Sequence, residues 1–488
     1  MPSDVVERLE AKEWKDVEQD STMRWNPSWR TALKSGLRSL LLWNNPSNGQ
    51  SDRLRPTAYL DGLRGFAAFI VYWHHHQLWV HRSHWETLES GFGHKDENYF
   101  VTFPGIRNFV IGGHYAVSIF YVISGYVLSA KPLSLIHAGE QAKLADNLSS
   151  ATFRRWIRLY MPLIATTFII MSLWHSFGGI WVDGAEPKSS YGEELWAWYA
   201  EVKNYSFIFN TGGGPWLSYN HHLWSIPLEF KGSIVIYTSL LALSTCSRNA
   251  RILAQVGLAY YFLYVVDGYY CALFMAGMLL CDLDLLAAKD ELPLLLSRLQ
   301  TFKKPIAYHL LAISFFLGGV PTHKDDINLL RKNRGWYYLS FLKPQAVYNY
   351  QWFYLFWAAV FLVGMVRHVP WLKRFFETRF CQYLGRISYA LYLVHGPVLS
   401  ILGDRLYTAV GWYTDTQAEH LSGWVDKFPL PKTGPLGLEV SFLIPHLIIL
   451  PVTIYCAELV TRGIDEPSVK FPQWLYRITT GRPVKLPA

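Results

Sequence analysis

The chain has 488 residues, of which 51% are hydrophobic and 16% aromatic, and its formal net charge at neutral pH is +8. The apolar residues gather in runs about as long as a membrane span, which excludes a set of ordinary soluble domains. The basic residues lie in short loops between these runs, so we interpret the positive charge as a membrane-topology signal and exclude nucleic acid as a partner.

The first 56 residues are predicted to form a cytosolic segment without a cleavable signal peptide, because residues 1–20 are polar and charged and contain no apolar core. Within this segment, Arg30, Lys34 and Arg38 are interspersed with leucines at the spacing of one helical face. The pattern favours a basic amphipathic helix over residues 29–43 that lies on the membrane surface, and a short soluble helix fits the same spacing.

Residues 57–467 are predicted to form the membrane domain of an all-α, polytopic integral membrane protein, with about ten transmembrane helices around a polar central cavity. Residues 468–488 would follow as a cytosolic tail. The fifth and sixth spans are the least secure, because only Asp267-Gly268 joins them. The ten spans are residues 59–80, 109–130, 159–182, 222–245, 251–266, 269–286, 304–320, 351–368, 387–402 and 437–461.

The distribution of basic residues predicts that both chain termini are cytosolic. With the N-terminus inside, 30 of the 45 Lys and Arg residues fall in cytosolic segments and 13 in the loops on the other side. Residues 321–350 depart from this bias, so a missed span or a re-entrant segment would lie there. We expect the protein in the endoplasmic reticulum or another endomembrane. The five cysteines lack metal-ligand spacing, so we expect neither a disulfide framework nor a metal site.

The stretch from Tyr59 to His76 carries ionisable groups into an apolar run, where such groups are costly and often functional. Eleven residues turn an α-helix through about 1100°, roughly 20° more than three full turns. Arg64 and His75 therefore share one helical face and lie about 16 Å apart along the axis. His74 and His76 point about 100° to either side of His75. The competing interpretation is a polar patch whose hydrogen bonds are satisfied between packed helices.

Two further stretches place small or basic residues at membrane depth or at its edge. Ser124-Gly125 can let two helices approach closely, which is a packing role. Arg154, Arg155 and Arg158 lie at the cytosolic start of a span, where guanidinium groups suit phosphates. Ordinary anchoring by positive charge explains the arginines equally well.

Two others combine charge with aromatic hydroxyls. Glu229 lies inside an apolar run and needs a partner, for which Arg64 or a histidine of the first span is a candidate, and a structural ion pair is the alternative. Tyr389, Tyr392 and His395 follow a three-to-four spacing that forms a polar stripe on a helix, although core packing is the more common role of such tyrosines.

Together these stretches resemble membrane-bound acyltransferase family 3, over about residues 55–470, and the acidic end near residue 465 is similar to fungal members. The resemblance implies about ten transmembrane helices, a cytosolic acyl-CoA donor and transfer to a hydroxyl group. The family's Arg and His pair falls on Arg64 and His75. The motifs that carry the resemblance are Asp61-Gly62-Leu63-Arg64 ahead of His75, residues 120–125, the three arginines, Leu223-Trp224-Ser225 ahead of Glu229, and residues 385–389 ahead of His395.

We therefore predict an integral-membrane O-acyltransferase that uses acyl-CoA, preferably acetyl-CoA, as co-substrate and has no bound cofactor. Its partners would be membrane lipid and a hydroxylated small natural product or lipid as acceptor. A proton-coupled transporter is the alternative, since it too places ionisable groups at membrane depth. The predicted catalytic residues are His75, Arg64 and Glu229; Arg154, Arg155 and Arg158 would bind the anionic end of coenzyme A; further cavity candidates are Asp61, His74, Ser124, Tyr389 and His395.

Overall fold

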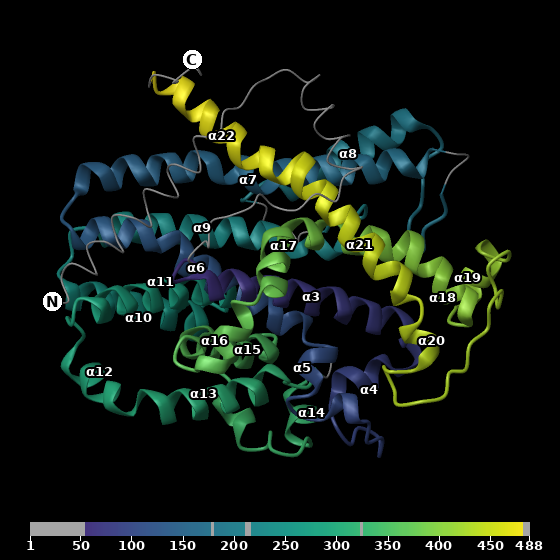
Figure 1. Ribbon diagram of the computed structural model, residues 1–488, viewed down its shortest axis with the longest axis horizontal. Helices are drawn as coiled ribbons and strands as arrows, with labels where there is room; N and C mark the ends of the chain where they lie inside the picture. Colours follow the sequence, from purple (N-terminus) through teal and green to yellow (C-terminus); the bar gives the residue numbers. More distant parts are fainter. Residues whose placement is uncertain (1–53, 177–179, 210–215, 323–325, 482–488) are drawn as a thin grey trace.

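The computed structural model describes residues 54–176, 180–209, 216–322 and 326–481 (Figure 1). Within these ranges the chain is helical and forms no β-strand, which confirms the all-α prediction for this part of the sequence. The amphipathic helix predicted over residues 29–43 and the last seven residues lie outside the described ranges.

Figure 1 shows α3, α6, α7, α9, α10, α11 and α13 running roughly along the longest axis of the molecule. Residues 248–288 form two helices, α10 and α11, on either side of the break predicted at Asp267-Gly268. In chain order the helices are α3 (Ala58–Val80), α4 (Trp85–Ser90), α5 (Arg107–Val110), α6 (Gly113–His137), α7 (Gln141–Trp174), α8 (Tyr191–Tyr205), α9 (Ser225–Ala242), α10 (Arg248–Tyr260), α11 (Tyr269–Ala288), α12 (Leu294–Leu299), α13 (Lys303–Gly318), α14 (Ile327–Arg331), α15 (Tyr350–Val366), α16 (Pro370–Phe376), α17 (Arg379–Val398), α18 (Asp404–Val410), α19 (Asp415–His420), α20 (Val440–Leu443), α21 (His446–Val460) and α22 (Glu466–Thr479).

Two close helix crossings, each built on a pair of glycines, hold the bundle together. α3 packs against α17, and a Cβ atom on Gly65 would lie only 2.2 Å from the backbone nitrogen of Gly385. α6 packs against α11, and a Cβ atom on Gly125 or on Gly277 would lie 2.1 Å from a backbone carbonyl oxygen of the other helix. Small residues at such crossings let backbones touch, which is how membrane helices pack without a hydrophobic driving force.

The ten predicted spans are not confirmed by the length and hydropathy of the described helices. Among the described residues, four segments are long and apolar enough to cross a membrane: α6, α7, α11 and the stretch Val440–Thr479. A fifth is added if α15 and α16, which meet at a bend of 95°, count as one broken span. The remaining predicted spans are either short, such as the 16 residues of α13, or carry charged and imidazole groups, as α3 does.

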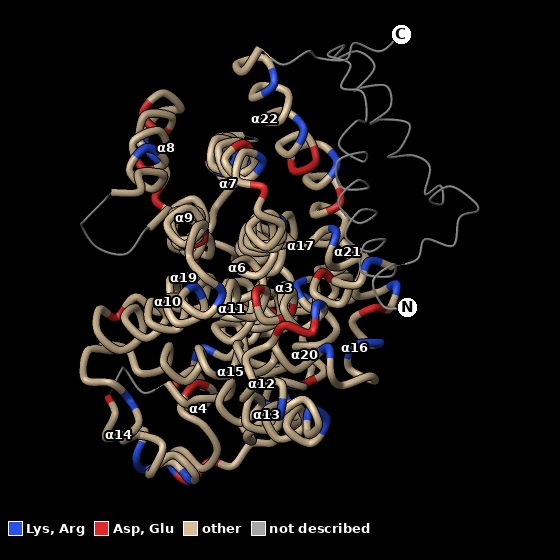
Figure 2. Tube along the Cα trace, turned by 90° about the vertical axis from the view of Figure 1, so that its left-hand side faces the viewer, with Lys and Arg blue, Asp and Glu red and all other residues tan. Residues whose placement is uncertain are grey.

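The exceptional basic segment 321–350 contains only short helices in its described part, α14 and a 3₁₀ turn at Leu339–Leu342, so no further span appears there. Figure 2 looks nearly end-on at α7 and shows Lys and Arg next to Asp and Glu where α22 packs against α7. Charges of opposite sign thus meet where α22 packs against α7, as in the ion pair of Arg158 and Asp465.

Candidate active site

The three consecutive histidines of α3 point to three different neighbours. His74 faces the start of α6, where its ring lies 5.7 Å from that of His114. His75 faces α17 and the 3₁₀ turn His221–Trp224, whereas His76 faces α18 and α21. His74 and His76 are buried and His75 is partly exposed. The 100° step of a helix therefore gives each imidazole its own environment.

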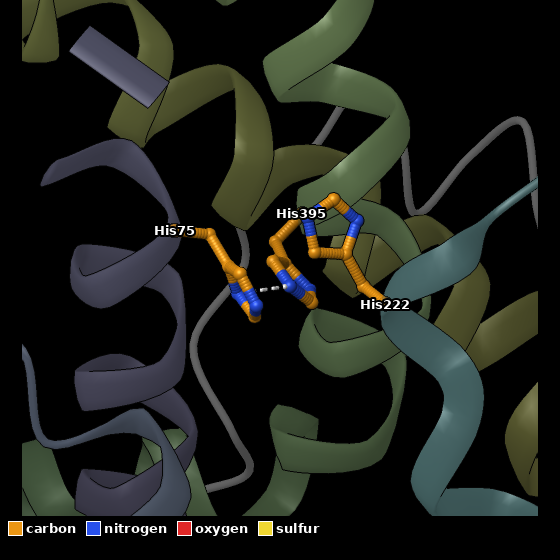
Figure 3. Close-up of side chains that lie close together, drawn as sticks. All are labelled: His75, His222 and His395. Atoms are coloured by element: carbon orange, nitrogen blue, oxygen red, sulfur yellow. Dashed lines mark hydrogen bonds between the residues drawn. The ribbon is translucent and has the colours of Figure 1, made fainter. Parts of the chain in front are cut away.

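His75, His222 and His395 form a cluster of imidazoles contributed by α3, the 3₁₀ turn and α17 (Figure 3). Their ligand nitrogen atoms all lie within 4.8 Å of one another, so this is the group of described residues that has the spacing to hold a metal ion. His395 Nε2 lies 3.1 Å from His75 Nδ1, within hydrogen-bonding distance. The ring of His222 meets that of His75 edge to face, with centroids 4.2 Å apart.

Hydrogen bonds between the 3₁₀ turn and α17 fix the positions of His222 and His395. Asn220 Nδ2 donates to the carbonyl oxygen of Leu393 at 3.0 Å, and the Ser225 hydroxyl lies 2.7 Å from the Tyr392 hydroxyl, which also donates to the carbonyl of His222. A Cβ atom on Gly396 would lie 2.4 Å from His222 Nδ1, so only glycine lets this ring approach α17. Of the predicted polar stripe of α17, Tyr392 thus attaches the turn.

A second buried network surrounds His76. His76 Nδ1 lies 2.7 Å from the Tyr407 hydroxyl, which lies 3.2 Å from His446 Nε2. His446 Nδ1 lies 2.8 Å from the Tyr72 hydroxyl, so the four groups form a continuous hydrogen-bonded chain. This chain joins α3, α18 and α21 through His76 Nδ1, whereas His76 Nε2 is buried and makes no hydrogen bond to a described residue.

Charged groups gather on α3, α7 and α9 in a separate cluster. Glu229 pairs with Arg155, not with a histidine of the first span, and the Ser124 hydroxyl also hydrogen-bonds to it. Arg64 lies 3.3 Å from Asp61 and donates to the carbonyl of Gly385 at 3.3 Å. Arg64 Nε is buried and makes no hydrogen bond to any described residue. Arg64 and His75 therefore both lie against α17. Arg64 lies at the end of α3 that carries the charged groups, which we call the ionic end.

The three arginines of α7 differ in their partners. Arg158 pairs with Asp465 and donates to Ser468 Oγ at 3.0 Å, which attaches α22 to α7. Arg154 Nε donates to the carbonyl of Ser150, and among the described residues it forms no ion pair. Tyr389 donates to the carbonyl of Leu159 and lies under the guanidinium of Arg158, as a packing residue does.

The expected polar central cavity is not confirmed. The described residues instead enclose a small polar cavity of about 30 Å³, the space of roughly one water molecule, beside His74. It is lined among others by Arg107, Asn108, His114 and Gln351. The sequence pointed to His75 and His395 but missed His222, whose only signal was its position next to the Leu223-Trp224-Ser225 motif.

In a comparison with known protein families, residues 57–455 match the family described as the acyltransferase domain. The O-acetyltransferase PaAT-1 of Phomopsis amygdali is 29% identical over 469 residues, which cover 88% of each chain. The acyltransferase clz18 of Cochliobolus lunatus is 24% identical over 87% of this chain and 97% of its own. The acyltransferase R4 of a Phoma species is 22% identical over 87% and 96%, respectively. No solved structure matches the chain.

Proposed function

Because the chain belongs to the acyltransferase domain family, we propose that it is an integral-membrane O-acyltransferase that moves an acetyl group from acetyl-CoA to a hydroxyl of a small natural product or lipid. The relative PaAT-1 is named an O-acetyltransferase, which supports transfer to oxygen. The observation that carries the proposal is the position of His75, the half-buried residue in a cluster of three histidines whose other two members are buried. A partly exposed, uncharged imidazole is suited to accept a proton from a bound hydroxyl.

In the proposed reaction, His75 takes the proton of the acceptor hydroxyl while its oxygen attacks the carbonyl carbon of the thioester. Collapse of the tetrahedral intermediate breaks the carbon–sulfur bond. The leaving thiolate then takes the proton from the His75 imidazolium, and the ring returns to its neutral form. The step needs no covalent acyl-enzyme.

The ionic cluster would bind the anionic part of coenzyme A from the cytosol. Arg64 retains an unpaired buried Nε–H among the described residues, and Arg154 makes no ion pair there, so both have donors for phosphate oxygens. Arg155 and Arg158 already neutralise Glu229 and Asp465 and would hold the shape of the site. The distance of about 16 Å between Arg64 and His75 lets the pantetheine arm reach the imidazoles while the phosphates stay at the ionic end.

The proposal is tested by the release of free thiol from acetyl-CoA by purified protein in detergent, with a hydroxylated extract as acceptor. We expect His75→Ala to lower kcat by about 10²- to 10⁴-fold, the usual contribution of a positioned general base. His74→Ala and His76→Ala should cost much less, because these rings face other helices. Near-normal turnover by His75→Ala would overturn the base assignment. Wild-type protein that transports a solute but releases no thiol would favour a proton-coupled transporter.

A further inference from the structure

The hydrogen bond between His75 and His395 is part of a longer chain with a fixed direction. His395 Nε2 lies 3.1 Å from His75 Nδ1, and His395 Nδ1 lies 3.2 Å from the carbonyl oxygen of Leu391, one turn earlier in α17. His395 is 1% exposed, so neither ring nitrogen of His395 is available to bulk water. The order of groups is therefore His75, His395 and a backbone carbonyl (Figure 3 shows the first two).

The backbone carbonyl decides which nitrogen atoms carry protons. A carbonyl oxygen can only accept, so His395 Nδ1 must donate its N–H to Leu391. A neutral imidazole has one N–H, which leaves Nε2 of His395 as an acceptor. Nδ1 of His75 must then be the donor in the bond between the two rings. The remaining nitrogen of His75, Nε2, carries a lone pair.

We propose that His395 is a positioning residue that fixes His75 in the tautomer whose Nε2 acts as the base. This inference rests on the proposed function, in which His75 takes the acceptor proton. The arrangement has the logic of a nucleophile–base–orienting group set, with a neutral imidazole where a carboxylate usually stands. When Nε2 of His75 gains the acceptor proton, Nδ1–H still donates to His395, so the ring does not have to turn during the reaction.

A metal ion between the two rings is the alternative to this hydrogen bond, because a metal would need the lone pairs of both facing nitrogens. In the hydrogen-bonded chain, one of the two facing nitrogens carries a proton instead. His222 contributes differently: its ring packs edge to face against His75, and its close approach to Gly396 holds it there. We assign it no part in the proton chain.

Two amide substitutions of His395 test the proposal with matched size and polarity. The amide of Gln can reach the place of Nε2 and accept from His75, whereas the shorter Asn reaches only the place of Nδ1. We expect His395→Gln to keep kcat within about 10-fold of wild type and His395→Asn to lower it by about 10²-fold or more, as misplaced tautomers do in orienting-group variants. The KM for acetyl-CoA should change less than about 3-fold in both, because the donor's phosphates bind elsewhere.

A double substitution separates positioning from general stability. In the His75→Ala background, His395→Asn should lower kcat by less than a further factor of about 2, because His395 acts only through His75. Equal losses in the Gln and Asn variants, or a full additional loss in the His75→Ala background, would overturn the proposal. So would one equivalent of zinc in active protein that disappears with either variant. If His75→Ala remains active, the assignment of His75 as the base is wrong. If His75→Ala is inactive but His395→Asn remains active, His75 can still be the base and only the positioning role of His395 is wrong.

Discussion

Substituting Gly65 by alanine should separate α3 from α17 and thereby impair the histidine pair. The added methyl carbon would lie 2.2 Å from the backbone nitrogen of Gly385 and 2.4 Å from the carbonyl carbon of Leu384. Both distances are more than 0.9 Å shorter than 3.4 Å, the lower limit of ordinary van der Waals contact. Because the neighbours are backbone atoms, no side chain can rotate to make room, and the helices must part by about 1 Å.

The consequence for the site follows from the length of α3. Gly65 and His75 belong to the same continuous helix, so a shift at the crossing is carried to the bond between His75 Nδ1 and His395 Nε2. A bond of 3.1 Å would lengthen to about 4 Å, beyond hydrogen-bonding range. We expect a loss of about 1–3 kcal/mol of stability from overpacking and about 10²-fold in kcat from misplacement.

Gly257→Ala is the matched control, because Gly257 lies in the helix α10 and a Cβ atom there would meet nothing within 4 Å. It should leave turnover unchanged and raise stability by about 0.5–1 kcal/mol, the usual gain from replacing glycine in a helix. Thermal unfolding in detergent and thiol release from acetyl-CoA measure both variants. Wild-type stability and turnover in Gly65→Ala would refute the claim that this crossing sets the site.

Two further predictions concern topology and the donor site. Asn204, exposed at the end of α8 and followed by Tyr-Ser, should be glycosylated in a eukaryotic membrane and Asn147 should not, as a glycosidase mobility shift would show; the reverse pattern would invert the topology. Arg154→Ala should raise the KM for acetyl-CoA by about 10- to 100-fold through lost charge-assisted hydrogen bonds. Arg155→Ala should instead destabilise the fold by about 1–3 kcal/mol, because it leaves the half-buried carboxylate of Glu229 without its arginine. Joint replacement of both residues should recover much of that loss.

The direction of each histidine in α3 could be predicted because it depends on one helix alone. A fixed turn of about 100° per residue places Arg64 and His75 on a common face and sends His74 and His76 elsewhere, whatever surrounds the helix. The close approach at Gly125 has a similar local origin, since a residue without a side chain is needed wherever two backbones touch. These predictions needed no knowledge of which helix would be the neighbour.

The partners of the charged groups could not be predicted, because they come from distant parts of the chain. Arg158 meets Asp465, 307 residues later, and His75 meets His395 across 320 residues. Glu229 had two candidate partners and took a third, Arg155, because α7 and not α3 presents its guanidinium to that face of α9. Pairing of this kind is decided by helix packing, which a periodic pattern in one segment does not encode.

The charged groups and the imidazoles of the site lie in two separate clusters, which suits them to two different tasks. Arg155 and Arg158 are paired with Glu229 and Asp465, so the anionic donor would meet the donors that remain on Arg64 and Arg154. His75, His222 and His395 form a group without a carboxylate among them, so nothing there favours permanent protonation. An imidazole kept neutral can accept a hydroxyl proton, and a neighbour fixed by a backbone carbonyl determines which nitrogen does so. Replacing His395 by a residue that cannot accept the hydrogen bond from His75 Nδ1 should therefore stop His75 from acting as a base, while every charge in the site stays in place.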